Sequence, residues 1–196
     1  MNKKIKALHV GVSGIPFNKS AAINRCMTIY SILIEQGVDF TILNNEPTLS
    51  IEKIEKTGSF NGFKYKYTSL SPNISKYFMI RRISKFIGRL LEFYEIFKMG
   101  LRNNIDVLFY YPSGKFIELI FYRIASKLFG FKILSHYVEY RTAFEGRSKI
   151  INRINDKLFD NYFMFYVDGV IPISDYLVKN IRSKSKNLPL IKIPPI

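Results

Sequence analysis

Residues 5–12 have the sequence Ile-Lys-Ala-Leu-His-Val-Gly-Val, a short apolar run rich in β-branched side chains. Such a run is typical of a strand buried in a parallel sheet. A helix is predicted from about Ser20 to Gln36, because apolar residues recur there at spacings of three and four and Gly37 follows as a helix-ending residue. Residues 39–43 form the next predicted strand. Together these segments predict a strand–loop–helix–strand unit of an open α/β sheet.

The remainder of the chain continues this alternation of strand-like and helix-like segments. The predicted strands are 63–68, 106–111, 132–137, 169–174 and 190–193, and the predicted helices are 76–102, 115–129, 148–166 and 175–184. Apart from its one strand, the stretch between residues 45 and 75 shows no clear pattern. The sum predicts an α/β fold, a Rossmann-like parallel sheet of about six or seven strands with helices on both faces.

The composition bounds the class of protein. The chain has 196 residues and is 47% hydrophobic, which is enough to form one folded domain and excludes disorder. Cys26 is the single cysteine, so no internal disulfide can form and a reducing compartment is expected. Neither a secretory signal nor an uncharged apolar run of about 18 residues is visible, so we expect a cytoplasmic location.

Positive charge is the strongest compositional signal. The net charge of +15 attracts nucleic acid, anionic lipid surfaces or phosphorylated substrates, although a coding bias towards lysine is an alternative explanation. In the predicted helix 76–102 an apolar stripe runs beside a basic one, which is typical of a helix lying on an anionic membrane surface. The predicted membrane-surface residues are Arg82, Lys85, Phe86 and Arg89. The alternative is an ordinary helix whose apolar stripe faces the core.

The loop after the first strand is the first candidate site, because ligands of open parallel sheets bind beyond the carboxyl ends of the strands. Gly14 would let the backbone approach a ligand, and the helix start at Ser20 would direct amide N–H groups at a phosphate. The predicted phosphate group comprises Ser13, Gly14, Asn18, Ser20, Ala21 and Arg25. A tight turn at Gly14 and a solvated Arg25 are the alternatives. One glycine does not make a dinucleotide motif.

The segment His136-Tyr-Val-Glu139-Tyr-Arg141 is the second candidate site. Either His136 or Glu139 could act as general base on a hydroxyl, and a structural role for His136 is the alternative. Aromatic and hydroxyl side chains at the end of strand 106–111 suit a sugar or an amphipathic acceptor. The predicted acceptor group comprises Tyr111, Ser113, Gly114, Arg141 and Ser174. Two distant histidines and one cysteine supply no metal site, so no metal is predicted.

Four segments, in this order, resemble the N-terminal domain of GT-B glycosyltransferases of the large retaining group usually called family 4. The first is Gly14-Ile-Pro-Phe-Asn-Lys-Ser-Ala-Ala-Ile-Asn-Arg25 with Leu33-Ile-Glu-Gln-Gly37 and Phe40-Thr-Ile-Leu43. The others are Phe129-Gly-Phe-Lys-Ile-Leu-Ser-His-Tyr-Val-Glu139, Val170-Ile-Pro-Ile-Ser-Asp-Tyr-Leu177 and Ile191-Lys-Ile-Pro-Pro-Ile196. The resemblance implies one half of a GT-B architecture.

The resemblance implies transfer of a sugar from a sugar nucleotide to a glycan or lipid-linked acceptor in surface polysaccharide synthesis. Residues 1–190 would form the acceptor-binding domain and 191–196 the start of an interdomain linker, with the donor-binding C-terminal domain absent and this piece inactive alone. Gly14 would then approach the donor diphosphate, and His136 or Glu139 would lie near the transferred sugar. The expected partners are the sugar nucleotide, the acceptor, the missing domain and an anionic surface on the inner face of the membrane; no cofactor is expected.

A standalone α/β module that binds nucleic acid or another phosphorylated ligand is the alternative function. The basic residues are scattered along the chain rather than clustered, and no helix-turn-helix or RNA-recognition signature is visible, so nucleic acid is the less favoured partner.

Overall fold

The structure is a computed structural model that describes residues 4–49, 53–112, 115–143 and 150–195. Within these ranges the strands are β1 (Lys6–Val10), β2 (Asp39–Asn44), β3 (Thr57–Phe60), β4 (Phe63–Tyr67), β5 (Val107–Tyr110), β6 (Lys132–Tyr137) and β7 (Gly169–Pro172). The helices are α1 (Ala21–Glu35), α2 (Phe78–Leu101), α3 (Phe116–Phe129), α4 (Ile150–Tyr162) and α5 (Asp175–Lys184), with 3-10 helices η1 (Arg141–Ala143) and η2 (Phe163–Phe165). The described strands form a mostly parallel sheet in the order β3-β4-β2-β1-β5-β6-β7, which confirms the predicted Rossmann-like α/β fold.

The chain divides into two compact units, the first extending to Leu108 and the second running from Phe109 to Pro195. In the first unit β2 pairs in parallel with both β1 and β4, and β3 is antiparallel to β4. Leu8, Phe40 and Ile42 of these strands are fully buried, as expected for strands covered on both faces.

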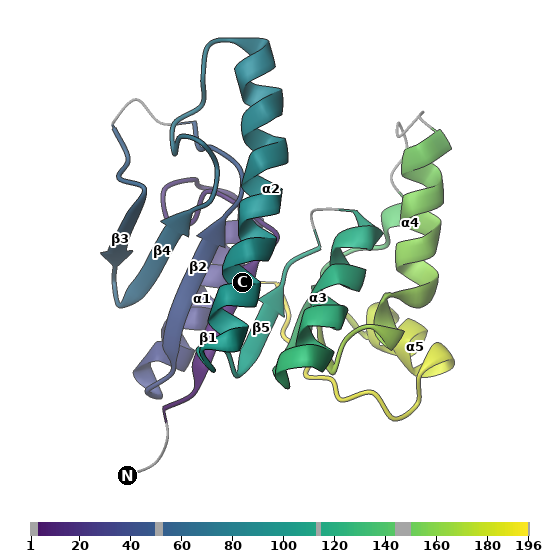
Figure 1. The fold of residues 1–196 in the computed structure, drawn as a ribbon. Helices are drawn as coiled ribbons and strands as arrows, with labels where there is room; N and C mark the ends of the chain where they lie inside the picture. The colour runs from purple at the N-terminus through teal and green to yellow at the C-terminus, as the bar shows by residue number, and fades with distance from the viewer. Residues whose placement is uncertain (1–3, 50–52, 113–114, 144–149, 196) are drawn as a thin grey trace. The chain divides into compact units, whose positions relative to one another are not determined.

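Helices α1 and α2 lie on opposite faces of the first unit's strands (Figure 1). Helix α1 begins as predicted, because the Ser20 hydroxyl accepts a hydrogen bond from the N–H of Ile23. It ends where Gly37 takes a positive φ of 87°, a conformation that glycine adopts readily. Tyr30 of this helix stacks on Phe40 of β2, with ring centroids 4.3 Å apart.

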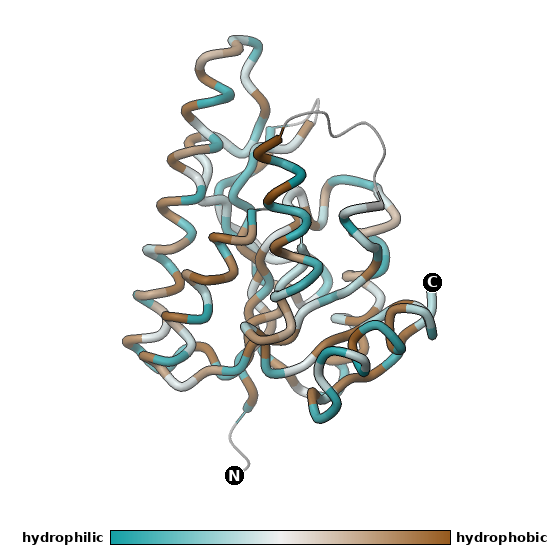
Figure 2. The backbone as a smooth tube through the Cα atoms, turned by 90° about the vertical axis from the view of Figure 1, so that its right-hand side faces the viewer, coloured by the Kyte–Doolittle hydropathy of each residue, from teal (hydrophilic) through white to brown (hydrophobic). Residues whose placement is uncertain are grey.

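Helix α2 packs through a face on which three of the five buried residues are small, and the predicted apolar stripe faces solvent. The buried residues recur every four positions: Ser84, Gly88, Glu92, Ile96 and Gly100. The exposed apolar row consists of Met79, Ile83, Phe86, Leu90, Tyr94 and Phe97. Figure 2 shows apolar and polar segments alternating along this helix, which stands at the left of the view. Small residues face inward because the helix lies directly on backbone: a Cβ added at Gly88 would lie 2.1 Å from the carbonyl oxygen of Asn45.

In the second unit β6 pairs in parallel with β7, and α3, α4 and α5 complete the alternation. Helix α3 ends at Gly130, which has a φ of 79°, and α5 begins at Ser174, whose hydroxyl accepts from the N–H of Leu177. Phe159 and Phe163 are fully buried and stack at 4.9 Å between ring centroids. These two helix ends follow the sequence prediction.

Three segments differ from their predictions. Residues 57–60 form the edge strand β3, which was not predicted, because all four residues are exposed and carry no apolar alternation. The predicted last strand at 190–193 runs beside β7, where Ile191 and Ile193 donate to the carbonyl oxygens of Val170 (3.1 Å) and Pro172 (3.0 Å), but only one bridge, between Leu190 and Val170, is formed. Pro172 of β7 has no N–H with which to continue the ladder. The predicted helix 148–166 is divided into α4 and η2, and its first two residues lie outside the described ranges.

Candidate functional site

The first loop, residues 11–18, joins β1 to α1 and is closed by a side chain at the end of β2. Asn44 Oδ1 accepts hydrogen bonds from the backbone N–H groups of Gly14 (2.8 Å) and Ile15 (3.2 Å). Its Nδ2 donates to the carbonyl oxygen of Ile15 (2.7 Å). Because Asn44 is fully buried, this two-sided clasp is shielded from water and holds the loop against the sheet. Two amides of the loop are therefore engaged within the protein.

Gly14 occupies a position that only glycine fits well. Its φ is 94°, and an added Cβ would lie 2.1 Å from the side-chain nitrogen of Asn18. Asn18 in turn donates its backbone N–H to the carbonyl oxygen of Gly14 (2.8 Å). Asn18 of the same loop, and not a ligand, makes the close approach that glycine permits, as the tight-turn alternative expects.

The remaining members of the predicted phosphate group lie at the start of α1. The Ser20 hydroxyl caps the helix, Ala21 is its first residue, and Arg25 is 4% exposed and so is not a solvated cation. Beside Arg25, burial raises the pKa of the Cys26 thiol to about 12, which leaves it in the unreactive protonated form. A phosphate role for these residues stays a prediction.

His136, at the end of β6, lies among aromatic rings of the second unit. It is fully buried, with its ring centroid 5.5 Å from that of Tyr111 and 6.4 Å from that of Phe109. Glu139, three residues further on, is exposed. The structure thus brings His136 and Tyr111 together, and the two proposed bases differ in access: an acceptor hydroxyl in solvent can reach Glu139 directly.

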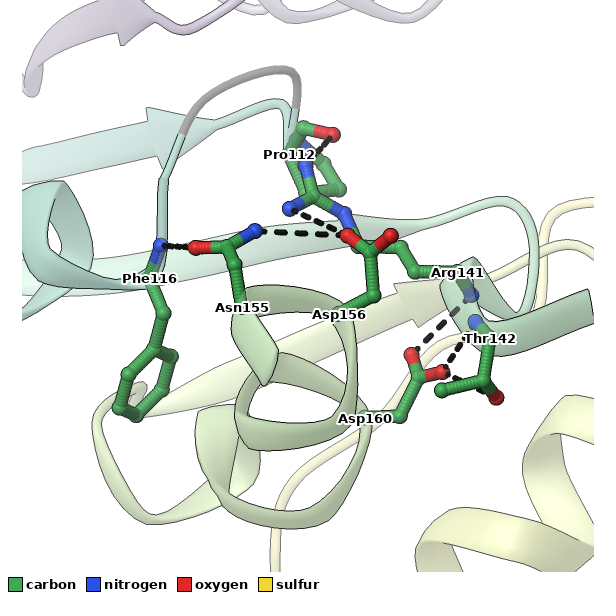
Figure 3. A network of polar contacts seen from close by, with 7 residues as sticks. All are labelled: Pro112, Phe116, Arg141, Thr142, Asn155, Asp156 and Asp160. Atoms are coloured by element: carbon green, nitrogen blue, oxygen red, sulfur yellow. Dashed lines mark hydrogen bonds and ion pairs between the residues drawn. The ribbon is translucent and has the colours of Figure 1, made fainter. Parts of the chain in front are cut away.

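Arg141 is buried and tied to the loop that follows β5 (Figure 3). Its Nη2 donates to the carbonyl oxygen of Pro112, and its Nη1 lies 3.9 Å from Asp156 Oδ1. The guanidinium also lies over the ring of Phe159, 4.3 Å from the centroid. These partners give Arg141 a positioning role, holding the end of β5 against α4. Ser113 and Gly114, predicted in this loop, lie outside the described residues.

Polar side chains of α4 hold two segments of the second unit in place, the start of α3 and the residues that follow β6 (Figure 3). Asn155 Oδ1 accepts from the N–H of Phe116 (2.7 Å) and so caps the start of α3. Asp160 accepts from the N–H groups of Arg141 (3.2 Å) and Thr142 (2.8 Å) and from the Thr142 hydroxyl (2.8 Å). Sequence reasoning missed these residues. The available signal was the spacing of Asp156 and Asp160, which are four residues apart on either side of the buried Phe159.

The hydroxyl of Ser174, predicted for the acceptor group, is used as the cap of α5. On the same helix Asn180 bridges two tyrosines of the β6 end: its Nδ2 donates to the Tyr137 hydroxyl (3.2 Å), and its Oδ1 accepts from the Tyr140 hydroxyl (3.1 Å). Lys184 donates to the carbonyl oxygen of Asp160 (2.9 Å). The middle of α5 is thereby fastened to the segment that carries Glu139, and its last residue to α4.

The predicted membrane-surface residues of α2 separate into two kinds. Phe86 and Arg82 are exposed, and the guanidinium of Arg82 lies 4.9 Å from the ring centroid of Phe78. Lys85 and Arg89 instead form ion pairs with Glu46, which follows β2, at 2.7 Å and 3.8 Å. Two of the four predicted residues thus already have an acidic partner within the first unit.

The described residues form neither a metal-holding group of side chains nor a membrane-spanning helix. Among them no three or more His, Cys, Asp or Glu side chains gather where a metal ion could be held. None of the described helices has the length and apolar content needed to cross a bilayer. The prediction that no metal takes part stays a prediction.

Comparison with known proteins identifies no relative: the chain matches no protein-family model and no curated protein.

Proposed function

We propose that this chain is the acceptor-binding half of a retaining glycosyltransferase that acts on a glycan or lipid-linked acceptor in surface polysaccharide synthesis, at the cytoplasmic face of a membrane. The donor is a sugar nucleotide. The observation that carries the proposal is the group at the end of β6, where Tyr111 lies against the buried ring of His136 and Glu139 exposes its carboxylate. Aromatic side chains and an exposed carboxylate at one strand end suit a sugar whose hydroxyl must lose a proton.

Glu139 and His136 have different roles in this proposal. During transfer the acceptor oxygen forms a bond to the anomeric carbon, the bond from that carbon to the diphosphate breaks, and the hydroxyl proton leaves. The exposed Glu139 carboxylate can accept that proton. His136, enclosed by Phe109 and Tyr111, keeps the aromatic surface in place as a positioning residue.

The outward face of α2 supports the membrane part of the proposal. Phe86 is 66% exposed, and the apolar row to which it belongs runs along most of the helix. The exposed Arg82 lies beside this row. A helix with adjoining apolar and basic surfaces can lie in the interface of an anionic bilayer.

The test is genetic and biochemical. Deletion of the gene in its own cell should remove or truncate a surface polysaccharide, and reintroduction of the intact gene should restore it, as measured by electrophoresis and sugar analysis of the purified glycan. The intact gene carrying Glu139→Gln should fail to restore it, whereas the gene carrying Glu55→Gln, which removes another exposed carboxylate, should restore it fully.

An unchanged surface glycan in the deletion strain would contradict the proposal. If the chain then bound polyuridylate with a strong dependence on salt, the alternative of a nucleic-acid-binding module would take its place.

A further inference from the structure

The backbone of Glu46 is fixed by the first loop. Ser13 Oγ accepts hydrogen bonds from the N–H groups of Asn45 (3.1 Å) and Glu46 (3.2 Å) and donates to Asn45 Oδ1 (2.8 Å). This places the Glu46 carboxylate at the carboxyl end of β2, where open parallel sheets bind their ligands. Ser13, which was predicted to bind phosphate, therefore holds Glu46 in place. Glu46 is in turn the acidic partner of Lys85 and Arg89, which were predicted to face the membrane.

The carboxylate of Glu46 lies against two cations one helical turn apart on α2. Lys85 Nζ is 2.7 Å from one oxygen, and Arg89 Nη2 is 3.8 Å from the other. The Lys85 side chain is 51% exposed and those of Arg89 and Glu46 are each 32% exposed. Ion pairs with this exposure contribute little to stability, because solvent screens them. An anion with more charge and more acceptor oxygens can displace the carboxylate without unfolding the helix.

The cations are bordered by the exposed apolar row. Phe86 follows Lys85 and Leu90 follows Arg89, and both apolar side chains are more than half exposed. Residues four apart lie above one another on a helix, so the two cations and the two apolar residues form adjoining strips. A molecule that fits both strips has an anionic head and a hydrocarbon chain.

We infer that Lys85 and Arg89 bind the phosphate group of a lipid phosphate in exchange for the Glu46 carboxylate, with the hydrocarbon chain lying on Phe86 and Leu90. The inference rests on the proposed function only in taking this lipid phosphate to be the acceptor. Glu46 then holds the two cations in place until the phosphate arrives, which keeps them together at the end of β2.

The test is calorimetric titration of the chain at low salt with dihexanoyl phosphatidic acid, a water-soluble lipid phosphate, and with glycerol 3-phosphate, which has the same head without chains. The parent should bind the lipid phosphate about tenfold more tightly than glycerol 3-phosphate. Glu46→Gln should bind both probes at least about threefold more tightly, because the competing carboxylate is gone. The double variant Lys85→Gln/Arg89→Gln should lose at least about tenfold in affinity for both.

Two further variants make the outcome decisive. Phe86→Ser/Leu90→Ser should bind the two probes equally, because only the chain-binding strip is removed. Lys179→Gln/Lys186→Gln, which removes the same charge from exposed positions of the second unit, should bind like the parent. The inference is overturned if folded Glu46→Gln binds more weakly than the parent, or if the double cation variant keeps its affinity. Since binding is measured separately from polysaccharide synthesis, either proposal can fail while the other stands.

Discussion

His9 shows how one residue of β1 makes stability depend on pH. It is fully buried, with Nδ1 2.8 Å from the Tyr30 hydroxyl and Nε2 3.1 Å from the carbonyl oxygen of Val12. A carbonyl can only accept, so Nε2 carries the proton and Nδ1 accepts from Tyr30. Burial lowers the pKa of His9 from 6.5 to about 4, although the bond to Val12 opposes the shift.

The sign of the effect follows from the unfolded chain, in which His9 takes up a proton below its usual pKa of 6.5 while the folded protein excludes it down to about pH 4. Stability is therefore complete above pH 6.5, and about 3 kcal/mol of it is lost as the pH falls from 6.5 to 4. Urea unfolding of the parent and of His9→Asn across this range measures the effect. The difference in the free energy of unfolding between parent and variant should shrink on acidification, because the variant has no imidazole at position 9 to take up a proton. Equal pH dependence of the two proteins would contradict this role of His9.

Asn44, at the end of β2, holds the first loop in place, and sequence reasoning could not find it. The tight turn at Gly14 was weighed from the sequence because glycine is a local signal. The clasp depends instead on a side chain 30 positions away, which reaches the loop only once β1 and β2 have paired. An asparagine after a strand otherwise looks like any loop residue.

At the scale of the element, helix ends were predictable and helix orientation was not. Gly37, Gly130 and the Ser174 cap act within a few residues of the chain, so their pattern is readable from sequence. Which face of α2 packs is decided by the surface beneath it. Backbone close to Gly88 leaves no room for large side chains, so the sequence's most apolar stripe lies outside.

Gly88→Ala tests this orientation. Alanine favours an exposed helix by about 1 kcal/mol over glycine, but here its Cβ meets the carbonyl oxygen of Asn45, and overpacking costs about 1–3 kcal/mol. We expect a net loss of up to about 2 kcal/mol in the free energy of unfolding. Phe86→Ala, on the opposite face, should change it by less than about 0.5 kcal/mol. A large loss at Phe86 with none at Gly88 would mean that the helix packs by its apolar stripe.

For the whole molecule, the net charge of +15 and the outward row of α2 predict binding to anionic vesicles. The chain should sediment with phosphatidylglycerol-containing vesicles and not with pure phosphatidylcholine, and the bound fraction should fall as salt rises above about 0.15 M. Arg81→Glu/Arg82→Glu, near the start of α2 where Arg82 borders the apolar row, should weaken binding about tenfold or more.

The matched control carries the same change of charge elsewhere. Lys179→Glu/Lys186→Glu should bind vesicles nearly as the parent does if α2 is the contact surface. Equal weakening by both pairs would show that binding follows total charge alone, and the membrane part of the proposed function would then lose its support.

The inverted packing of α2 also determines how this helix can diverge over evolutionary time. Position 88 has no room for even a Cβ, and positions 84 and 100 are buried, so drift at these positions is restricted whatever the protein does. Positions 79, 86 and 90 are exposed, carry no such restriction from the fold and can turn polar by neutral change. Apolar residues that persist there in distant descendants would record selection by a partner outside the chain.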